Sequence, residues 1–241
     1  MEYRSFSYKE TNLRFRVQHP EQMIREVLLQ RKLLEGYIRK YPQFLTSLVP
    51  IPPLSDAPSI ALAMHKASEL TGVGPMAAVA GVIAELAARA GRGVVENGGD
   101  IFLISETPVV IGVYGGKTPL SGRVGFRIDP QRMPMAVCSS SGKMGHSLSF
   151  GKADLVTVFS QSGALADAAA TLGGNLVQSA EDIESALAYL LSIPGIEAAW
   201  IEIDGKIGFK GNLPPLVKLE DEGFIKKITR DLRSGVRLED L

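Results

Sequence analysis

The spacing between apolar residues changes along this sequence, and this change is the sequence feature that most constrains the fold. Over residues 21–39 the apolar positions, which include Met23, Val27, Leu34 and Ile38, fall near a 3.6-residue spacing, as in an amphipathic helix. After Gly91 the chain breaks into short apolar runs between glycine turns, which indicates strands. Helices and strands therefore cluster instead of alternating strictly. The pattern favours a single α+β domain with mixed or antiparallel sheets over a doubly wound fold.

The same pattern predicts individual elements. A hairpin is expected over residues 5–17 and a packed, proline-rich loop over residues 42–58. Residues 137–151 are rich in serine and glycine and are expected to form a loop. The predicted helices are residues 21–39, 59–70, 75–90, 163–172 (ending at Gly173-Gly174) and 181–191. The predicted strands after Gly91 are residues 93–96, 101–105, 108–114, 123–128, 155–160, 198–203 and 207–210.

We expect one domain over residues 1–218. Residues 219–241 are charged and lack a clean apolar face, so we expect a tail or a docked C-terminal helix there. No short sequence repeat is visible.

Composition narrows the classes of function. Lys and Arg together number 26, as do Asp and Glu, so the net charge is zero and gives no overall attraction to nucleic acid or to an anionic membrane. No run reaches the roughly 18 apolar residues of a membrane span. The single cysteine, Cys138, rules out a disulfide within the chain and suits a reducing compartment. We therefore expect a cytoplasmic protein with no nucleic-acid or membrane partner.

The first candidate site lies on the predicted helix 163–172. Asp167 and Thr171 are four residues apart and would share one helix face, where a carboxylate and a hydroxyl suit a hard cation such as Mg²⁺. The alternative is a polar edge on a tightly packed helix, with Asp167 near the helix N-terminus interacting with its dipole.

Three further segments could bind a ligand. The turn Asn97-Gly98-Gly99-Asp100 would let a ligand approach the backbone, although a plain capped β-turn explains it too. A loop with three hydroxyls, a lysine and a histidine could clamp a phosphate or could be merely solvated. A glycine turn that enters a helix could bind an anion or could simply connect two helices. The residues concerned are Ser139, Ser140, Ser141, Gly142, Lys143 and His146 in the loop, and Gly72 and Gly74 in the glycine turn.

Taken in order, these segments resemble the ApbE family of flavin transferases. That family has a glycine turn entering a helix, a strand ending in Asn-x-Gly-Gly-Asp, a Thr-Ser-Gly loop, a histidine-centred segment, a strand, and a helix of the form Ala-Asp-Ala-x-x-Thr. The matching segments here are residues 72–80, 96–101, 140–142, His146, 155–159 and 166–171. The resemblance covers roughly residues 70–175.

The resemblance implies an ApbE-like fold, a site for FAD or a related nucleotide, and Mg²⁺ held by Asp167 and Thr171. It implies that Asn97, Gly98, Gly99, Asp100 and the Ser139–Gly142 loop line the site, with His146 as a catalytic candidate. It also implies transfer of FMN to a Thr or Ser of a flavoprotein target, by a monomer or a homodimer.

Two segments depart from the family pattern. Pro75 stands near the family's usual lysine, and of the His-x-x-Asp-Pro-x-Thr-Gly signature only His146 is kept. The sequence therefore leaves open a Mg²⁺-dependent flavin transferase, a ligand-binding protein without transfer chemistry, and a scaffold that keeps the fold only.

Overall fold

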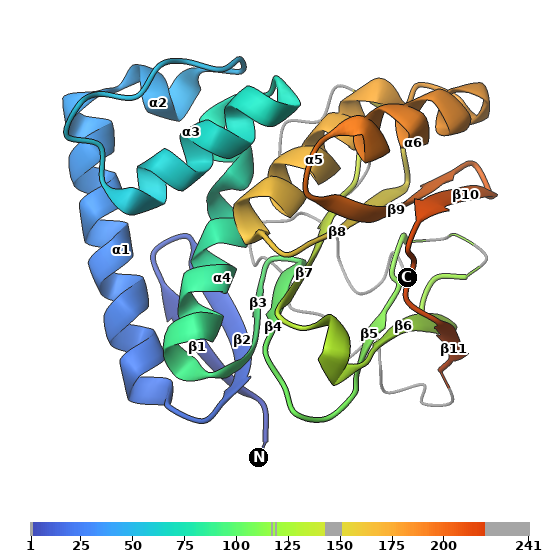
Figure 1. Cartoon of the computed structure of the whole chain (residues 1–241), viewed down its shortest axis with the longest axis horizontal. Coiled ribbons are helices and arrows are strands. Elements are labelled where there is room, and N and C mark those ends of the chain that lie inside the picture. The colour runs from blue at the N-terminus through green and yellow to red at the C-terminus, as the bar shows by residue number, and fades with distance from the viewer. Residues whose placement is uncertain (1, 117, 119, 143–150, 220–241) are drawn as a thin grey trace.

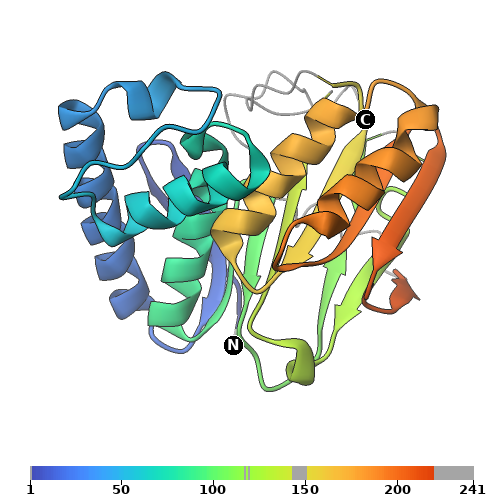
Figure 2. The ribbon, with the colours of Figure 1, turned by 45° about the horizontal axis from the view of Figure 1, so that its top comes forward.

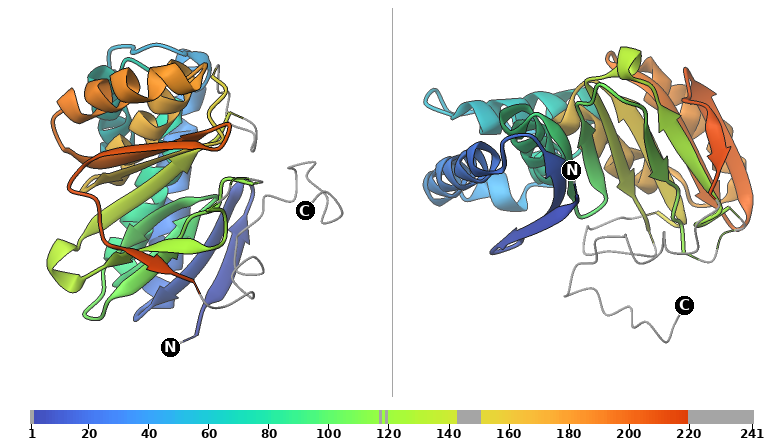
Figure 3. Two further views of the ribbon diagram at one scale, coloured as in Figure 1. Left: turned by 90° about the vertical axis from the view of Figure 1, so that its right-hand side faces the viewer. Right: turned by 90° about the horizontal axis from the view of Figure 1, so that it is seen from below.

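The computed structural model describes residues 2–116, 118, 120–142 and 151–219 (Figure 1). In this part of the chain an eight-stranded sheet carries helices on one face and a three-stranded sheet on the other. Figure 2 shows the helices in front of the large sheet, and Figure 3 shows the same layers from two further sides. The fold is α+β, as the clustering of predicted helices and predicted strands along the sequence indicates.

The elements of the N-terminal part follow the predicted boundaries closely. The hairpin is β1 and β2, and the long helix is α1. The proline-rich loop contains only the short helix α2, and the two helices before Gly91 are present. The bounds are β1 Arg4–Tyr8, β2 Thr11–Val17, α1 Pro20–Lys40, α2 Gln43–Thr46, α3 Ser59–Thr71, the 3-10 turn η1 Pro75–Ala78 and α4 Val79–Gly91.

The second part of the chain supplies the remaining strands and two helices. The bounds are β3 Gly93–Asn97, β4 Asp100–Leu103, β5 Val109–Gly112, β6 Val124–Ile128, η2 Pro130–Arg132, β7 Met135–Ser140, β8 Leu155–Ser160, α5 Gly163–Leu176, η3 Ala180–Asp182, α6 Ile183–Ser192, β9 Ile196–Ile203, β10 Lys206–Gly211 and β11 Leu216–Lys218. Strand β11, which the sequence pattern does not indicate, pairs with β6 in the smaller sheet.

The large sheet is built from two similar halves. Its order is β1-β2-β3-β4-β7-β8-β9-β10, and every described pairing is antiparallel. Each half has the order β-β-α-α-β-β, with α1 and α4 in the first half and α5 and α6 in the second, while α2 and α3 are additional. The repetition lies in the topology and is not visible in the sequence.

The antiparallel register brings several hairpin turns to the same end of the strands of the large sheet, which we call the hairpin end. The turn at Lys9–Glu10, the turn at Gly98–Gly99 and the end of β7 at Ser140 all lie there. Gly98 and Gly99 have φ values of +64° and +104°, a left-handed conformation that suits a tight two-residue hairpin and favours glycine. Segments far apart in sequence therefore meet where the sequence motifs are concentrated.

Each face of the large sheet has its own apolar core. Side chains such as Val95, Phe102 and Val158 pack under the helices. On the other face Trp200 and Phe159 each make an edge-to-face contact with Phe126 of the small sheet, at ring-centroid distances of 5.6 and 4.9 Å. The alternation of strand side chains between two packed faces explains why strands such as β8 are buried along their whole length.

Two predictions of local structure are wrong. Residues 135–140, which include part of the predicted loop 137–151, form the central strand β7, because pairing with β4 and β8 outweighs the serine-rich composition. Helix α5 also continues through Gly173-Gly174 to Leu176. Gly173 is a packing residue, since a Cβ there would lie 2.8 Å from Cγ1 of Val156.

Helices α4 and α5 cross with their backbones in contact. A Cβ on Gly81 would lie 2.2 Å from the carbonyl oxygen of Gly163, and a Cβ on Gly163 would lie 2.3 Å from that of Gly81. Glu85 of α4 accepts a hydrogen bond at 2.7 Å from the backbone N–H of Gly163, the first residue of α5. Each glycine is therefore needed for the approach of the other helix.

The proline-rich segment is fixed by a buried histidine. Nδ1 of His65 on α3 lies 2.9 Å from the carbonyl oxygen of Ile51, and its Nε2 lies 3.0 Å from the hydroxyl of Tyr37 on α1. The same hydroxyl accepts a hydrogen bond at 3.1 Å from the backbone N–H of Leu54. Both ring nitrogens of His65 therefore have partners in the folded state, and burial lowers the pKa of His65.

Within the part of the chain that the structure describes, no single helix has the length and apolar character of a membrane span. The bent pair formed by α3 and residues 75–91 passes that test only as a pair, with a bend of 108°.

We predict that Gly81→Ala destabilises the protein by about 1–3 kcal/mol, because the new methyl group would overlap the backbone of α5. The measurement is the free energy of unfolding in urea. The control is Gly36→Ala on α1, where the nearest atom to a new Cβ is a guanidinium nitrogen at 3.9 Å. This control should stabilise the protein by about 0.5–1 kcal/mol. Equal effects of the two substitutions would contradict the crossing.

We predict that His65 makes the protein less stable in acid. Because its folded pKa is lowered, the unfolded state binds more protons below about pH 6.5, and stability falls as the pH drops through that value, by at most about 1.4 kcal/mol per pH unit. Urea unfolding from pH 8 to pH 5 should show a smaller loss in His65→Gln than in the unmodified protein. The control is His19→Gln, because His19 is exposed. Parallel stability curves for all three proteins would disprove this role.

Candidate functional site

Two carboxylates from distant parts of the chain line one pocket near the hairpin end of the large sheet. Asp100 opens β4 directly after the Gly98–Gly99 turn, and Asp167 lies on α5 where that helix crosses α4. Thr171, one turn further along α5, lines the same pocket as both carboxylates. The pocket thus joins the two acidic motifs of the sequence.

The position of Asp167 is fixed by the N-terminus of α4. The backbone N–H of Gly81 donates to Oδ2 of Asp167 at 2.8 Å. Ala78, the residue at the N-cap position of α4, has no side-chain oxygen, so the carboxylate on α5 provides the cap from outside the helix. The sequence alternative of a dipole interaction is therefore present, but with the N-terminus of α4 and not with that of α5.

Asp100 is held through its neighbours on the sheet. The backbone N–H of Ser139 on β7 donates to Oδ1 of Asp100 at 3.3 Å. The side-chain amide of Asn97, at the end of β3, donates to the carbonyl oxygen of Ala80 at 3.1 Å. Asn97 therefore ties the Gly98–Gly99 turn to the first turn of α4, close to Gly81.

Burial raises the pKa values of both carboxyls. It raises the pKa of Asp100 well above its usual range, and the neighbouring Asp167 raises it further. Burial also raises the pKa of Asp167 to about 7, although backbone N–H groups of Gly81 and Ala80 act in the opposite direction. Burial first, then the two carboxylates, raise the pKa of the Cys138 thiol. The site is one in which uncompensated negative charge is costly.

Asp100 lies at the junction of two cavities. The smaller cavity, of about 240 Å³, is lined by apolar side chains of the loop after α2 and of η1 together with Asp100, Asp167, Thr171 and Asn175. The larger cavity, of about 820 Å³, extends between α1, α4 and the hairpin end of the large sheet. The two share Leu45, Met76, Val79, Ala80 and Asp100. Their combined size is in the range of sites for drug-sized or nucleotide ligands.

The outer wall of the larger cavity was not anticipated from the sequence. It is formed by Lys9, Glu10 and Thr11 of the β1–β2 turn and by Arg31, Glu35 and Arg39 of α1. Arg31 and Glu35 are spaced as helix neighbours, which is readable from sequence. That the predicted hairpin packs against this helix face is a tertiary fact with no local signal.

The structure brings most of the predicted ligand-binding residues together. Asn97, Gly98, Asp100, Ser139, Ser140 and Ser141 line the larger cavity, and Gly74 lines the smaller one. Gly72 is exposed with φ of +75° at the C-terminus of α3, outside both linings. Gly142 lies outside both linings as well, and a Cβ there would be 2.4 Å from the carbonyl oxygen of Gly151. The predicted catalytic residue His146 lies outside the described residues.

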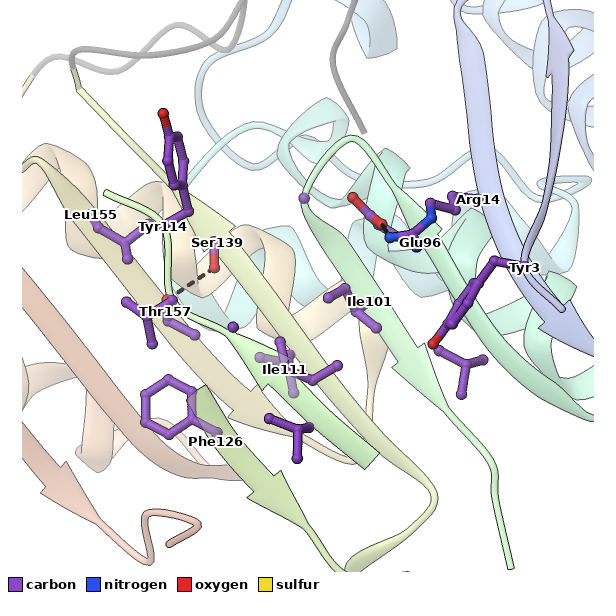
Figure 4. A pocket seen from close by; sticks show the side chains of 16 residues that line it. Tyr3, Arg14, Glu96, Ile101, Ile111, Tyr114, Phe126, Ser139, Leu155 and Thr157 are labelled. Carbon is purple, nitrogen blue, oxygen red and sulfur yellow. Dashed lines mark hydrogen bonds and ion pairs between the residues drawn. The ribbon is translucent and has the colours of Figure 1, made fainter. Parts of the chain in front are cut away.

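Gly99 lines a separate pocket on the other face of the sheet. This pocket, of about 180 Å³, lies between the two sheets. Figure 4 shows Ile111 and Phe126 of the small sheet facing Leu155 and Thr157 of β8 across it. The Ser139 and Thr157 hydroxyls are 2.9 Å apart. The two turn glycines therefore face different cavities.

The donor set at the carboxylate pair fits a hard divalent cation. Asp100, Asp167 and Thr171 offer two carboxylates and a hydroxyl, all oxygen, and a cation between the buried Asp100 and the half-buried Asp167 would offset the cost of their charge. No group of three or more His, Cys, Asp or Glu side chains suitable for a metal occurs among the described residues. Mg²⁺ in particular commonly uses one or two carboxylates and completes its shell with water and phosphate oxygens.

Comparisons with known proteins agree with this architecture. A family model described as "AbpE bacteria" matches residues 3–193. A UPF0280 protein of Methanocaldococcus jannaschii is 42% identical over 223 residues, which cover 88% of this chain and 91% of that protein. A UPF0280 protein of Methanopyrus kandleri is 44% identical over 223 residues, with the same two coverages.

Solved structures share the fold at low sequence identity. The flavin transferase ApbE from Vibrio cholerae is 13% identical with a TM-score of 0.55, covering 87% of this chain and 96% of that one. The ApbE protein from Thermotoga maritima is 13% identical with a TM-score of 0.53, covering 95% of this chain and all of that one. On the family match, this protein belongs to the AbpE bacteria family and has an ApbE-like fold.

Proposed function

We propose that this protein binds FAD or a related flavin nucleotide together with Mg²⁺, and transfers the FMN part to a Thr or Ser hydroxyl of a flavoprotein. The observation that carries the proposal is the carboxylate pair of the buried Asp100 and the half-buried Asp167, which with Thr171 lines one of two adjoining cavities large enough for a dinucleotide. The ApbE-like fold supports the same function.

Asp100, Asp167 and Thr171 would hold the cation, which when bound would polarise the pyrophosphate. The chain's own residues prepare this place. The N–H of Gly81 orients Asp167, and the N–H of Ser139 orients Asp100, so that neither carboxylate depends on the ligand for its position. Preset oxygen donors of this kind lose little freedom when a ligand binds.

The larger cavity would receive the remainder of the nucleotide. Ile83 and Val79 of α4 supply an apolar surface, while Ser140 and Ser141 supply hydroxyls at the end of β7. Gly98 lets a ligand approach the turn closely, since a Cβ there would meet nothing within 4 Å. This combination of apolar walls with a few polar groups is usual for nucleotide sites.

The proposed reaction is a displacement at phosphorus, in which the acceptor hydroxyl replaces AMP on the FMN half of FAD. The acceptor hydroxyl oxygen forms a bond to the phosphorus of the FMN half, the bond from that phosphorus to the AMP oxygen breaks, AMP leaves, and the hydroxyl proton is released. The only other reactant is the target protein. We also propose a cytoplasmic location, which the single buried cysteine, Cys138, supports.

Ligand binding without transfer is a second candidate function. Among the described residues, neither His19 nor His65 lines the cavities, so the described part of the site offers only carboxyl groups as acids and bases of moderate pKa. A protein of this kind would hold the nucleotide and would not attach it to a target. The two functions differ in whether AMP is released.

We predict that FAD with MgCl₂ raises the melting temperature of the protein, and that Asp167→Asn or Asp100→Asn removes the Mg²⁺-dependent part of the shift. Each variant keeps the shape of the side chain and loses its charge. The Kd for Mg²⁺, measured by titration calorimetry with FAD present, should rise at least about tenfold. Asp129→Asn, which alters a surface pair with Arg127, is the matched control. Unchanged Mg²⁺ affinity in both site variants would overturn the cation assignment.

We predict that the protein, incubated with FAD and Mg²⁺ in an extract of its source cells, releases AMP and leaves a fluorescent flavin attached to a protein band after denaturation. Asp167→Asn should lower the rate at least about a hundredfold, because the cation that stabilises the transferring phosphoryl group is lost. Tight FAD binding without AMP release would favour the second candidate. Absence of any flavin binding would reject both.

A further inference from the structure

The outer wall of the larger cavity carries positively charged side chains that are not part of the proposed cation site. Lys9, Arg31 and Arg39 all line the cavity, together with the carboxylates Glu10 and Glu35. Three cations against two carboxylates leave this wall with a net positive charge. The other end of the cavity, at Asp100, is acidic, so charge is distributed unevenly across the site.

Arg31 is the centre of this wall. Its Nη1 donates to the hydroxyl of Thr11 at 2.5 Å, and its Nη2 donates to Glu10 at 2.6 Å and to Glu35 at 3.2 Å. The guanidinium group is therefore held between the β1–β2 turn and α1, with only 12% of the side chain exposed. An arginine fixed in this way loses little further freedom on binding an anion.

One donor of Arg31 has no acceptor in the part of the chain that the structure describes. Its Nε is buried, and no hydrogen-bond partner for it exists within the described residues. The hydroxyl of Ser140, on the strand β7 that also lines this cavity, is likewise buried without a partner in the described part of the chain. Buried polar groups without partners are uncommon and costly, so both side chains keep unused hydrogen-bonding capacity beside the cavity.

The two outer cations are available to reinforce such a ligand. Lys9 is 46% exposed and is paired with Glu35, an interaction that raises its pKa, so it is charged at neutral pH. Arg39 is exposed, and no ion pair to it is found among the described residues. Glu10, which partly offsets Arg31, is 63% exposed and therefore well screened by water.

We propose that Arg31, with Ser140 and the flanking Lys9 and Arg39, forms an anion subsite that takes a phosphate group of the nucleotide. Resting on the proposed function, this assigns the pyrophosphate a place between the acidic end, where a cation would hold it, and the α1 wall, where Arg31 donates to it. The subsite makes the protein select phosphorylated flavins over riboflavin, because guanidinium groups bind phosphate through charge-assisted hydrogen bonds.

The test is titration calorimetry of inorganic pyrophosphate with Mg²⁺, of FAD, and of riboflavin, at low and high NaCl. Arg31→Gln should weaken pyrophosphate and FAD by about tenfold or more, and Lys9→Gln and Arg39→Gln by about three- to tenfold each. Affinity for riboflavin should stay the same, and the salt dependence of pyrophosphate binding should decrease in each variant. Arg25→Gln is the control, because Arg25 lies on α1 outside the cavity and pairs with the exposed Glu21.

The outcomes separate the subsite from the proposed function. Pyrophosphate binding that depends on Arg31, without any FAD binding, would support the anion subsite and reject the flavin ligand. FAD binding that is unchanged in Arg39→Gln, Lys9→Gln and Arg31→Gln would reject the subsite and keep the proposed function. An equal loss for riboflavin and FAD in Arg31→Gln, with no loss in the two outer variants, would show that Arg31 only shapes the cavity and would overturn the proposal.

Discussion

The backbone contact between α4 and α5 at Gly81 and Gly163 is the constraint on which the rest of the site depends. It brings the first turn of α4 onto Asp167 and the first turn of α5 onto Glu85, so each helix receives a carboxylate from the other at its positive end. A methyl group at either glycine would separate the helices. Asp167 would then lose its cap contact, and the pocket it shares with Asp100 would change shape.

The distribution of charge in the two cavities follows from this crossing and from the packing of the β1–β2 turn against α1. The crossing places the half-buried Asp167 near the buried Asp100, and loss of contact with water raises the pKa values of both carboxyls and makes a cation favourable there. At the other end, Lys9 of the β1–β2 turn together with Arg31 and Arg39 of α1 outnumber the carboxylates Glu10 and Glu35 and give a net positive charge. A ligand that is anionic and also carries a divalent cation matches both ends, as a nucleotide pyrophosphate does.

The topology explains how one end of the strands of the large sheet collects so many of the candidate site residues. Each half of the large sheet contributes hairpins whose turns lie on the same side, and the two halves join between β4 and β7. Asp100 and Ser139 belong to these two adjoining strands, and Asp167 lies on the helix that follows β8. The junction of the halves is therefore where the first and second halves of the chain can form one cavity.

The sequence by itself determined the class of fold, most element boundaries and the two acidic motifs, because these are encoded in local periods, glycine turns and short spacings. The hairpin at β1–β2, the helix α1 and the Asn97–Asp100 turn are examples. Local composition is misleading where tertiary contacts prevail. Residues 137–140 of the predicted serine- and glycine-rich loop pair in a central strand, and α5 passes through Gly173-Gly174, where Gly173 packs closely against Val156. Only the tertiary structure decided that Asp167 caps α4, that Asp100 lines the same cavity as Asp167, and that Arg31 lies in the outer wall of the larger cavity. Each of these joins residues far apart in the chain, for which no local pattern carries a signal.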